Sequence, residues 1–443
     1  MNLSIPEPVR ELLQRFSQSG FEAVVVGGCV RDSLLGQAPH DWDIATSARP
    51  EQIGEALGGF RLLETGLKHG TVTALSGGMA VEITTYRVDG TYSDSRHPDS
   101  VTFTGSLKAD LARRDFTVNA IAYSEKTGLA DCFGGRRDLE RRILRCVGEP
   151  ARRFEEDALR ILRGLRFAAV LGFSVEPETA RSMRELKFLL GRIAKERISA
   201  ELTKLLCGKD APAVLREFPD VIGQVLPEIL PMVGFDQHNP HHIYDVWEHT
   251  LHALGAIEPL PIPRLTMLLH DSGKPHTYTQ DEKGAGHFYG HGKISLQLAE
   301  AALKRLRFDG VTIRTVCLLI RLHDTPMIED EKWVRRQLGR IGEENFRTLI
   351  SVHRADCLAQ NPEYRDRLES YRRVGRILDK VLSEQQCFRL RDLAVNGRDL
   401  LALGFSPDKR LGETLGELLN AVIDGKCPNE KEALLRLAAR KMK

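Results

Sequence analysis

"AVVVGGCVRDSLLGQAPHDWDIAT" (23–46) decides how the first part of this chain folds. A run of valines ends in Gly27-Gly28 and an amphipathic stretch follows, so the pattern predicts a buried strand, a tight turn and a helix. "DWDIA" is expected to form the next strand, and side chains alternate along a strand, so Asp41 and Asp43 should share one face. Two carboxylates placed side by side indicate either a solvated strand edge or a site for a divalent cation.

The surroundings of the two aspartates favour the cation site. A turn that opens a helix presents free backbone N–H groups and can hold a phosphate, and Arg31 follows within one turn. Glu82 stands in the middle of an apolar strand, "AVEITTY", where a charge should be costly unless it is paired or bound to metal. Together these residues predict phosphoryl transfer, with a triphosphate at the turn and Mg²⁺ on the carboxylates.

The hydrophobic pattern divides the chain into a mixed part and a helical part. A helix is predicted over residues 4–20, and further strands over "TVTAL", "MAVEITTYRV" and "VTFTG", which gives a small α/β domain at about 20–145. From about 150 onward the period is helical, with a Pro- and Gly-rich boundary near 230–242 and a loop at 258–264. The expected fold class is therefore α+β.

Composition sets the general class of protein. The chain has 443 residues, of which 42% are hydrophobic and 28% charged, and its net charge of +2 does not by itself indicate a nucleic-acid partner. Its eight cysteines are scattered and form no CxxC pair, which is typical of reduced thiols in the cytoplasm. No stretch approaches 18 apolar residues and no signal peptide is evident, so we expect a cytoplasmic protein without a membrane segment.

Five motifs in order over residues 24–206 resemble those of the class II tRNA nucleotidyltransferase and bacterial poly(A) polymerase superfamily. They are "GGCVRDSLLG…HDWDIAT", "RRDFTVNA" (113–120), "DCFGGRRDL" (131–139), "EEDALRILRGLRFAAVLGF" (155–173) and "ERISAELTKLL" (196–206). The resemblance implies a polymerase β-like head that uses Mg²⁺ on Asp41 and Asp43, with Glu82 as a third carboxylate. It also implies that the nucleotide is bound by Gly27, Gly28, Arg31, Arg114, Asp115, Asn119, Glu156, Asp157 and Arg160.

Glu156, Asp157 and Arg160 would form the base-reading group, in which Asp157 and Arg160 pair with the base. Asp157 and Arg160 are three positions apart, so on one helix they would share a face. Cytosine and adenine both present an amino donor beside a ring-nitrogen acceptor, which a carboxylate and a guanidinium can pair with. Uracil and guanine present a carbonyl and a ring N–H instead, so the same pair would reject them.

A second group of polar residues lies in the helical part. "YDVWEHTLHAL", "MLLHDSGKPHTY", "HFYGHGKIS" and "RLHDTPM" carry seven of the fourteen histidines. His249, the pair His270-Asp271, and Asp324 follow the order H…HD…D, which resembles the HD superfamily of metal phosphohydrolases. Imidazole and carboxylate ligands in this order are suited to Mn²⁺, Ni²⁺ or Fe²⁺. The resemblance leaves open whether this part hydrolyses phosphate esters or serves only as an RNA-binding body.

The last part of the chain favours tRNA as the partner. "FRLRDLAVNGRDLLALGFSPDKRLGETLGELLNAVIDGKCPNEKEALL" resembles the tail of CCA-adding enzymes, and "RVDGTYSDSRHPDSV" (87–101) resembles the flexible loop of enzymes that add the terminal A. This implies addition of CCA to tRNA from CTP and ATP. The alternatives are an A-adding enzyme, a poly(A) polymerase, or an HD phosphohydrolase whose head only binds RNA.

We therefore expect four sections: a catalytic head at 1–145, a helical neck at 146–230, an HD body at 231–375 and a tRNA-binding tail at 376–443. The oligomeric state is not predicted.

Overall fold

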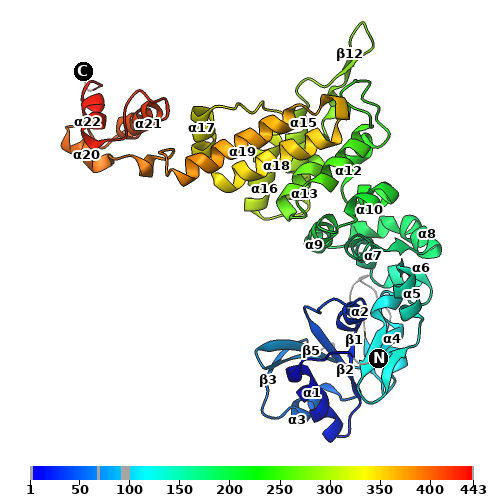
Figure 1. The fold of residues 1–443 in the computed structure, drawn as a ribbon. Helices are drawn as coiled ribbons and strands as arrows, with labels where there is room; N and C mark the ends of the chain where they lie inside the picture. The colour runs from blue at the N-terminus through cyan, green and yellow to red at the C-terminus, as the bar shows by residue number, and fades with distance from the viewer. Residues whose placement is uncertain (1–2, 67–69, 91–99, 442–443) are drawn as a thin grey trace. The chain divides into compact units, whose positions relative to one another are not determined.

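A computed structural model describes residues 3–66, 70–90 and 100–441 of the chain. The chain forms two compact units, Met1–Pro227 and Glu228–Lys443, which Figure 1 draws from blue to red along the sequence. The first unit combines a sheet with helices and the second is almost entirely helical, so the α+β fold class is confirmed. The finer division into four sections stays a prediction.

A seven-stranded sheet forms the centre of the head, with strand order β3-β4-β5-β2-β1-β8-β9. Only β2 and β5 pair in parallel; the other neighbours are antiparallel. The elements of this part are α1 (Glu7–Gln18), β1 (Ala23–Val26), α2 (Gly28–Leu34), β2 (Trp42–Thr46), α3 (Pro50–Ala56), β3 (Arg61–Gly66), β4 (Thr71–Ser76), β5 (Met79–Thr85), β6 (Arg87–Asp89), β7 (Val101–Phe103), α4 (Leu107–Ala112), the 3₁₀ helix η2 (Thr117–Asn119), β8 (Ile121–Ser124), β9 (Gly128–Asp131) and α5 (Gly135–Arg141).

The strand, turn and helix predicted at 23–46 are confirmed. Val24 and Val26 of β1 share a buried cluster with Ala45 of β2 and Ala122 of β8, because alternate side chains of a strand face the same layer. The predictions missed β3, β8 and β9, whose short segments have no clear alternation of apolar and polar residues. The first three residues of the predicted loop at 87–101 form β6, which pairs with β7 at its other end, and residues 91–99 lie outside the described residues.

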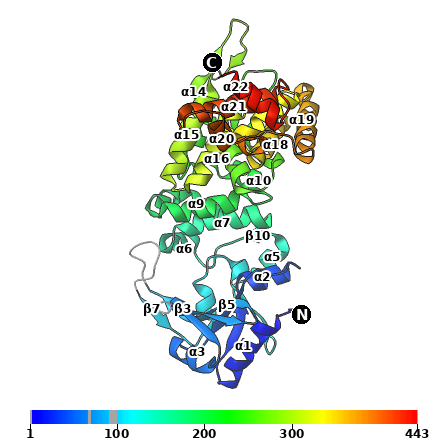
Figure 2. The ribbon, with the colours of Figure 1, turned by 90° about the vertical axis from the view of Figure 1, so that its left-hand side faces the viewer.

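Helices follow the head within the same unit. They are α6 (Pro150–Glu156), α7 (Leu159–Leu171), α8 (Pro177–Glu185), α9 (Lys195–Leu206), α10 (Ala211–Glu217) and α11 (Pro219–Gly223), with short strands β10 (Ile143–Leu144) and β11 (Ser174–Val175) and the 3₁₀ helix η3 (Lys187–Arg192). Figure 2 shows α7 and α9 lying side by side. The Phe167 ring of α7 packs edge-to-face on Phe116, at 6.0 Å between centroids, which ties this helix to the polypeptide just before η2.

The second unit is a stack of helices followed by a short helical tail. Its elements are η4 (Pro227–Met232), α12 (Val246–Ala256), α13 (Pro261–Leu269), α14 (Lys274–Thr277), β12 (Thr279–Gln280), β13 (Gly286–His287), α15 (His291–Arg305), α16 (Gly310–Leu322), α17 (Glu331–Ile341), α18 (Glu343–Ala359), η5 (Pro362–Tyr364), α19 (Arg367–Ser383), η6 (Leu390–Asp392), α20 (Gly397–Ala402), α21 (Lys409–Ile423) and α22 (Lys431–Ala439). In Figure 1, α18 and α19 run side by side, and α12 and α13 also pack against α18.

The structure corrects the loop predicted at 258–264. Helix α13 already begins at Pro261, because a proline ring fixes the helical φ angle and the first helical residue needs no N–H partner. The loop between α12 and α13 is therefore shorter than expected. None of the helices in the described ranges is long and apolar enough to cross a bilayer.

Candidate functional site

Asp43 and Glu82 lie directly opposite each other on the parallel strands β2 and β5. Burial and the neighbouring Glu82 carboxylate raise the pKa of Asp43 to about 6, although Arg114 acts in the opposite direction. Asp41 lies in the bend just before β2, and its side chain is exposed. A half-buried carboxylate that is crowded by like charges fits a divalent cation, which would relieve the repulsion.

The argument that Glu82 is buried in its strand is wrong. Its side chain is exposed, while Val81 and Ile83 on either side of it are fully buried. The strand is apolar on one face only, so the charge of Glu82 meets solvent and needs no partner for stability. The pairing of Glu82 with Asp43 across the two strands still favours Glu82 as a third metal-binding carboxylate.

The Gly-Gly turn brings the backbone up against these carboxylates. Gly27 has φ 83° and ψ −130°, a conformation that side-chain-bearing residues rarely adopt. A Cβ added to Gly27 would lie 3.0 Å from Arg114 Nη1 and 3.8 Å from Asp43 Oδ2. The turn, the Asp43 carboxylate and the Arg114 guanidinium, which come from three separate segments, therefore meet at one place.

Three of the predicted nucleotide-binding residues are joined in one chain of hydrogen bonds. Arg31 Nη1 donates to Asn119 Oδ1 at 2.7 Å, and Asn119 Nδ2 donates to Asp115 Oδ1 at 3.2 Å. Asp115 Oδ2 also accepts from Arg163 Nη2 at 2.6 Å, which links η2 to helix α7. Burial alone would raise the pKa of Asp115, but Arg163 and Asn119 hold it well below its ordinary value. The chain of contacts fixes the side chains around the turn.

The sequence analysis missed Arg163 and Arg166. Both guanidinium groups lie over the Phe167 ring, at 5.5 and 4.0 Å from its centroid, and Arg31 lies at 5.2 Å from it. Cations over an aromatic face are held by its quadrupole. Both residues lie within the motif at 155–173 and within an arginine-rich run at 136–166, and these were the sequence signals for them.

The predicted base-reading residues do not lie on one continuous helix. Helix α6 ends at Glu156, Asp157 has an extended backbone, and α7 begins at Leu159. Asp157 Oδ1 accepts from the Leu159 N–H at 3.1 Å and its Oδ2 pairs with Arg197 Nη2 at 3.1 Å. The expectation of a shared helical face is wrong, because Asp157 uses its side chain to start α7 and so breaks the helix.

Arg160 is held by three acceptors on two segments. Its guanidinium donates to the Glu156 carboxylate at 3.0 Å and to the backbone oxygens of Arg113 and Arg153. The side chain is only 12% exposed, so its orientation is set by these contacts. Glu156, Asp157 and Arg160 are therefore brought together by the junction of α6 and α7.

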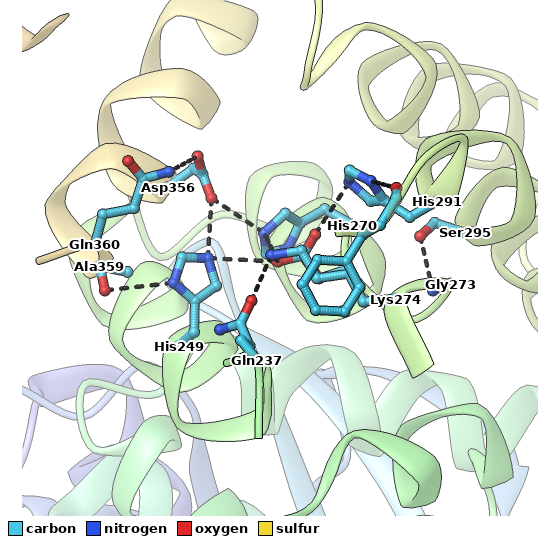
Figure 3. A network of polar contacts seen from close by, with 12 residues as sticks. Gln237, His249, His270, Gly273, Lys274, His291, Ser295, Asp356, Ala359 and Gln360 are labelled. Carbon is cyan, nitrogen blue, oxygen red and sulfur yellow. Dashed lines mark hydrogen bonds and ion pairs between the residues drawn. The ribbon is translucent and has the colours of Figure 1, made fainter. Parts of the chain in front are cut away.

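The second unit contains a cluster of buried imidazoles and carboxylates, which Figure 3 shows from close by. Within the described ranges, two groups of three or more possible ligand atoms lie within 4.8 Å of one another. One group is His249, His270, Asp271 and Asp356, and the other is Asp271, His291 and His323. Asp41, Asp43 and Glu82, which all lie in the described ranges, do not form such a group.

The sequence predicted Asp324 as the fourth ligand of the cluster, but Asp324 belongs to neither group. Asp356 of α18 occupies that place instead. Asp356 Oδ1 lies 2.9 Å from His249 Nε2 and 3.5 Å from His270 Nε2. His323, at the end of α16, is buried in the cluster, whereas the next residue, Asp324, is exposed and lines the pocket beside it. Asp356 gave no signal in the sequence, since it follows an ordinary helical pattern.

The charges within the cluster are strongly coupled. Burial would lower the pKa of His270, but the carboxylates of Asp271 and Asp356 raise it to about 10. His270 Nε2 lies 3.2 Å from Asp271 Oδ2, and Lys274 Nζ lies 2.8 Å from the same oxygen, so positive groups balance this buried carboxylate. The Nε2 atoms of the two imidazoles and the oxygens of the two carboxylates in the first group converge within 4.8 Å, and a divalent cation can bind such a mixed set.

Comparisons with known proteins cover most of the chain. Residues 23–145 match a family described as the poly A polymerase head domain. Residues 172–229 match a probable RNA and SrmB-binding site of polymerase A, and residues 287–438 match a putative domain 2 of tRNA nucleotidyltransferases. The matched families thus lie in both compact units.

Full-length relatives give the same result. A CCA-adding enzyme of Levilactobacillus brevis is 36% identical over 97% of this chain and 96% of its own, and one of Enterococcus faecalis is 34% identical over 98% and 97%. A crystal structure of the Bacillus stearothermophilus CCA-adding enzyme in complex with CTP is 30% identical, with a TM-score of 0.74 over 99% of this chain and 98% of that one. Since these relatives match nearly its whole length, the chain belongs to the family of CCA-adding tRNA nucleotidyltransferases.

Proposed function

We propose that this protein adds C, C and A in turn to the 3′ end of tRNA, from CTP and ATP, without a nucleic-acid template and with release of pyrophosphate. The observation that carries the proposal is the meeting of the Gly27 turn, the Asp43 carboxylate and the Arg114 guanidinium at one place. A phosphate needs backbone N–H groups and a cation, and a carboxylate beside them holds a metal ion. The family to which the chain belongs supports the same reading.

Asp41, Asp43 and Glu82 would hold Mg²⁺ at the head. When bound, Mg²⁺ supplies charge neutralisation of the triphosphate and lowers the pKa of the attacking 3′-hydroxyl. Arg114 adds a fixed positive charge beside Asp43 and the turn. Gly27 and Gly28 let the backbone approach the triphosphate, since a side chain at Gly27 would collide with Arg114.

The remaining head residues would position the nucleotide. The contacts of Asn119 and Asp115 with Arg31 and Arg163 keep these side chains ordered before the nucleotide arrives. Preorganised groups lose less entropy on binding than mobile ones. We assign Arg31, Asp115 and Asn119 to the sugar and phosphates.

Asp157 and Arg160 would select the base, with Glu156 holding Arg160 in place. The carboxylate would accept from the amino group of cytosine or adenine, and the guanidinium would donate to the adjacent ring nitrogen. Because Arg160 is anchored to three acceptors, it can keep one orientation for both bases. The role does not require the shared helix that the sequence suggested.

The helical neck and the tail at 376–443 would bind tRNA. The match of residues 172–229 to a probable RNA-binding site supports this, as does the match of 287–438 to a tRNA nucleotidyltransferase domain. All eight cysteines lie in the described part of the chain and are free thiols there, which supports a place in the cytoplasm.

One experiment separates this function from its alternatives. Purified protein is incubated with tRNA lacking CCA, with tRNA ending in CC, and with an unrelated RNA, each with CTP, ATP or both, and the 3′ ends are sequenced. The proposal predicts CCA on the first tRNA, a single A on the second, and little addition to the third. A single A on tRNA ending in CC with no addition to tRNA lacking CCA would indicate an A-adding enzyme, and long A tracts on all three RNAs would indicate a poly(A) polymerase.

A second function is favoured by the buried cluster of Figure 3. We propose that His249, His270, Asp271 and Asp356 hold a divalent ion such as Mn²⁺, Ni²⁺ or Fe²⁺ and that this part of the chain hydrolyses phosphate esters. The specific observation is that two imidazole nitrogens and two carboxylate oxygens of these residues lie within 4.8 Å of one another. Mixed imidazole and carboxylate ligands suit these metals.

His270→Ala tests this second function. The variant should lose the bound transition metal and any hydrolysis of p-nitrophenyl phosphate, while nucleotide addition to tRNA remains. His252→Ala is a matched control, because His252 is on the same helix as His249 but its side chain is exposed. Unchanged metal content and hydrolysis in His270→Ala would contradict the assignment.

A further inference from the structure

Asp110 in helix α4 is a fully buried carboxylate that contacts two consecutive arginines. Arg113 donates to its Oδ1 from Nε at 2.9 Å and from Nη2 at 2.8 Å, and the backbone N–H of Arg87 donates to the same oxygen at 3.3 Å. Asp110 Oδ2 forms an ion pair with Arg114 Nη2 at 3.6 Å. A buried charge is costly unless it is paired, and Asp110 has partners on both oxygens.

The two oxygens of Asp110 serve different purposes. Oδ1 ties the end of α4 to the start of β6, and any oxygen acceptor at this place could make the same hydrogen bonds. Oδ2 attracts Arg114, and this attraction depends on the negative charge. An amide in place of the carboxylate would therefore keep the structural contacts and remove only the charge that faces Arg114.

Arg114 extends from Asp110 to the Gly27 turn. Its Nη2 pairs with Asp110, and its Nη1 lies 3.0 Å from the position that a Cβ on Gly27 would occupy. A guanidinium is planar and rigid, so a contact at one nitrogen also fixes the place of the other. Arg114 lowers the pKa of Asp43, yet in the described part of the chain its ion pair is with Asp110 and not with Asp43.

This choice of partner matters for the chemistry at the turn. A guanidinium that moved onto the Asp43 carboxylate would occupy the oxygens that Mg²⁺ needs, and it would no longer face the triphosphate. Asp110 opposes this movement because it is a second, fully buried anion at the other nitrogen of the same guanidinium. Burial lowers the pKa of Arg114, and Asp110 is the strongest of the groups that act against this effect.

We infer that Asp110 is a positioning residue for nucleotide addition. It keeps the Arg114 guanidinium at the Gly27 turn and away from the Asp43 carboxylate. Being fully buried, Asp110 itself touches neither nucleotide nor metal, and it precedes the motif at 113–120, so it was not among the predicted site residues. The inference rests on the function proposed above, since Arg114 can act on a triphosphate only if one binds at the turn.

A double-substitution experiment on the full chain tests the inference. Asp110→Asn and Arg114→Ala are made singly and together, and kcat/KM for CTP is measured on tRNA lacking CCA, with labelled nucleotide so that slow variants remain measurable. Asp110→Asn alone should lower kcat/KM by about 10-fold or more, because groups in one buried network are strongly coupled. With Arg114→Ala already present, the same change should lower it by less than about threefold, because the group that Asp110 positions is gone.

The Mg²⁺ requirement gives a readout that a merely structural role would not change. If Arg114 turns onto Asp43 in Asp110→Asn, the Mg²⁺ concentration for half-maximal rate should rise several-fold. Asp138→Asn is a matched control, because Asp138 is also buried but binds Thr117 and Arg145 instead of Arg114. It should leave the Mg²⁺ requirement unchanged, and any loss of rate that it causes should be the same with and without Arg114.

The outcomes separate this inference from the proposed function. An equal loss from Asp110→Asn with and without Arg114 would overturn the positioning role and leave the proposed function intact. A wild-type chain that adds no nucleotide to any tRNA would overturn the proposed function and the positioning role with it. If Asp110→Asn fails to fold, Asp110→Ser takes its place, because serine keeps one oxygen acceptor for Arg113 and the Arg87 N–H.

Discussion

Asp157→Ala should remove base selection at a small cost in stability. In the structure the Asp157 carboxylate does two things that can be measured separately from base reading. It caps α7 through the Leu159 N–H at 3.1 Å, and it pairs with Arg197 at 3.1 Å. Any effect of the substitution on folding must come through these two contacts.

The magnitudes follow from the geometry. Loss of a helix cap costs typically about 1 kcal/mol. The pair with Arg197, whose side chain is 26% exposed, should contribute less than about 1 kcal/mol because solvent screens it. The free energy of unfolding should therefore fall by about 1–2 kcal/mol, out of about 5–15 kcal/mol for a typical domain. The variant should be fully folded at ordinary temperatures.

The free energy by which the enzyme discriminates between bases should fall by more than the free energy of unfolding. A uracil or guanine that faces the carboxylate leaves buried polar groups mispaired at roughly 1–3 kcal/mol each. Loss of that penalty corresponds to about a 5- to 150-fold loss of discrimination. Competition between CTP and UTP on tRNA without CCA, and between ATP and GTP on tRNA ending in CC, measures both ratios.

Two control variants separate selection from stability. Asp157→Asn keeps an oxygen that can cap α7, so it should be more stable than Asp157→Ala while still losing discrimination. Asp330→Ala removes the cap of α17, which Asp330 provides to the Trp333 N–H at 2.7 Å, and should cost similar stability without changing either ratio. Unchanged selectivity in Asp157→Ala, with a measurable loss of stability, would refute the base-reading role and leave only the cap.

Three further outcomes are expected. Asp43→Asn should leave folding intact and reduce nucleotide addition by orders of magnitude, since charge stabilisation by metal ions amounts to several kcal/mol at about 1.4 kcal/mol per tenfold; near wild-type rates would contradict the metal role. Gly27→Ala should weaken CTP and ATP binding in a titration, whereas Gly36→Ala, also at positive φ but with no heavy atom of the described structure within 4 Å of the added Cβ, should not. The pKa of Asp115 is lower in the folded state than its unfolded value of about 3.9, so its carboxylate stabilises the fold above that pH and the contribution is lost as pH falls; Asp115→Asn should flatten the acid side of a denaturation series, and an unchanged slope would contradict this.

Much of the head could be predicted because its signals are local. The valines of 23–26, the Gly27-Gly28 turn and the strand at 42–46 lie within one short stretch, so periodicity and turn chemistry determine them together. Gly27 is also consistent with the close approach of Arg114. Glycine adopts a positive φ angle readily, and its missing side chain leaves room for the Arg114 guanidinium. The sequence therefore predicted correctly those elements whose conformation depends on residues close to them along the chain.

The errors have a common physical cause. Glu82 was expected to be buried, since an apolar strand does not state which of its faces meets solvent. Asp157 was expected on a helix, since helical spacing does not reveal that its side chain caps the next helix instead. The packing of the sheet decides whether Glu82 is buried, and the position of a backbone N–H decides how Asp157 is used. Neither can be found in the local sequence pattern.

By itself the sequence determined the α+β division and the turn with its paired aspartates. It also identified His249 and His270 as candidate metal ligands. Only the tertiary structure decided which residues complete the buried cluster: it brings in Asp356 from α18, His291 from α15 and His323 from α16, and leaves Asp324 exposed. The reason is that helix packing sets the rotation of each helix about its axis. Residues separated by a hundred positions then share one carboxylate, and no local pattern of the chain records that register.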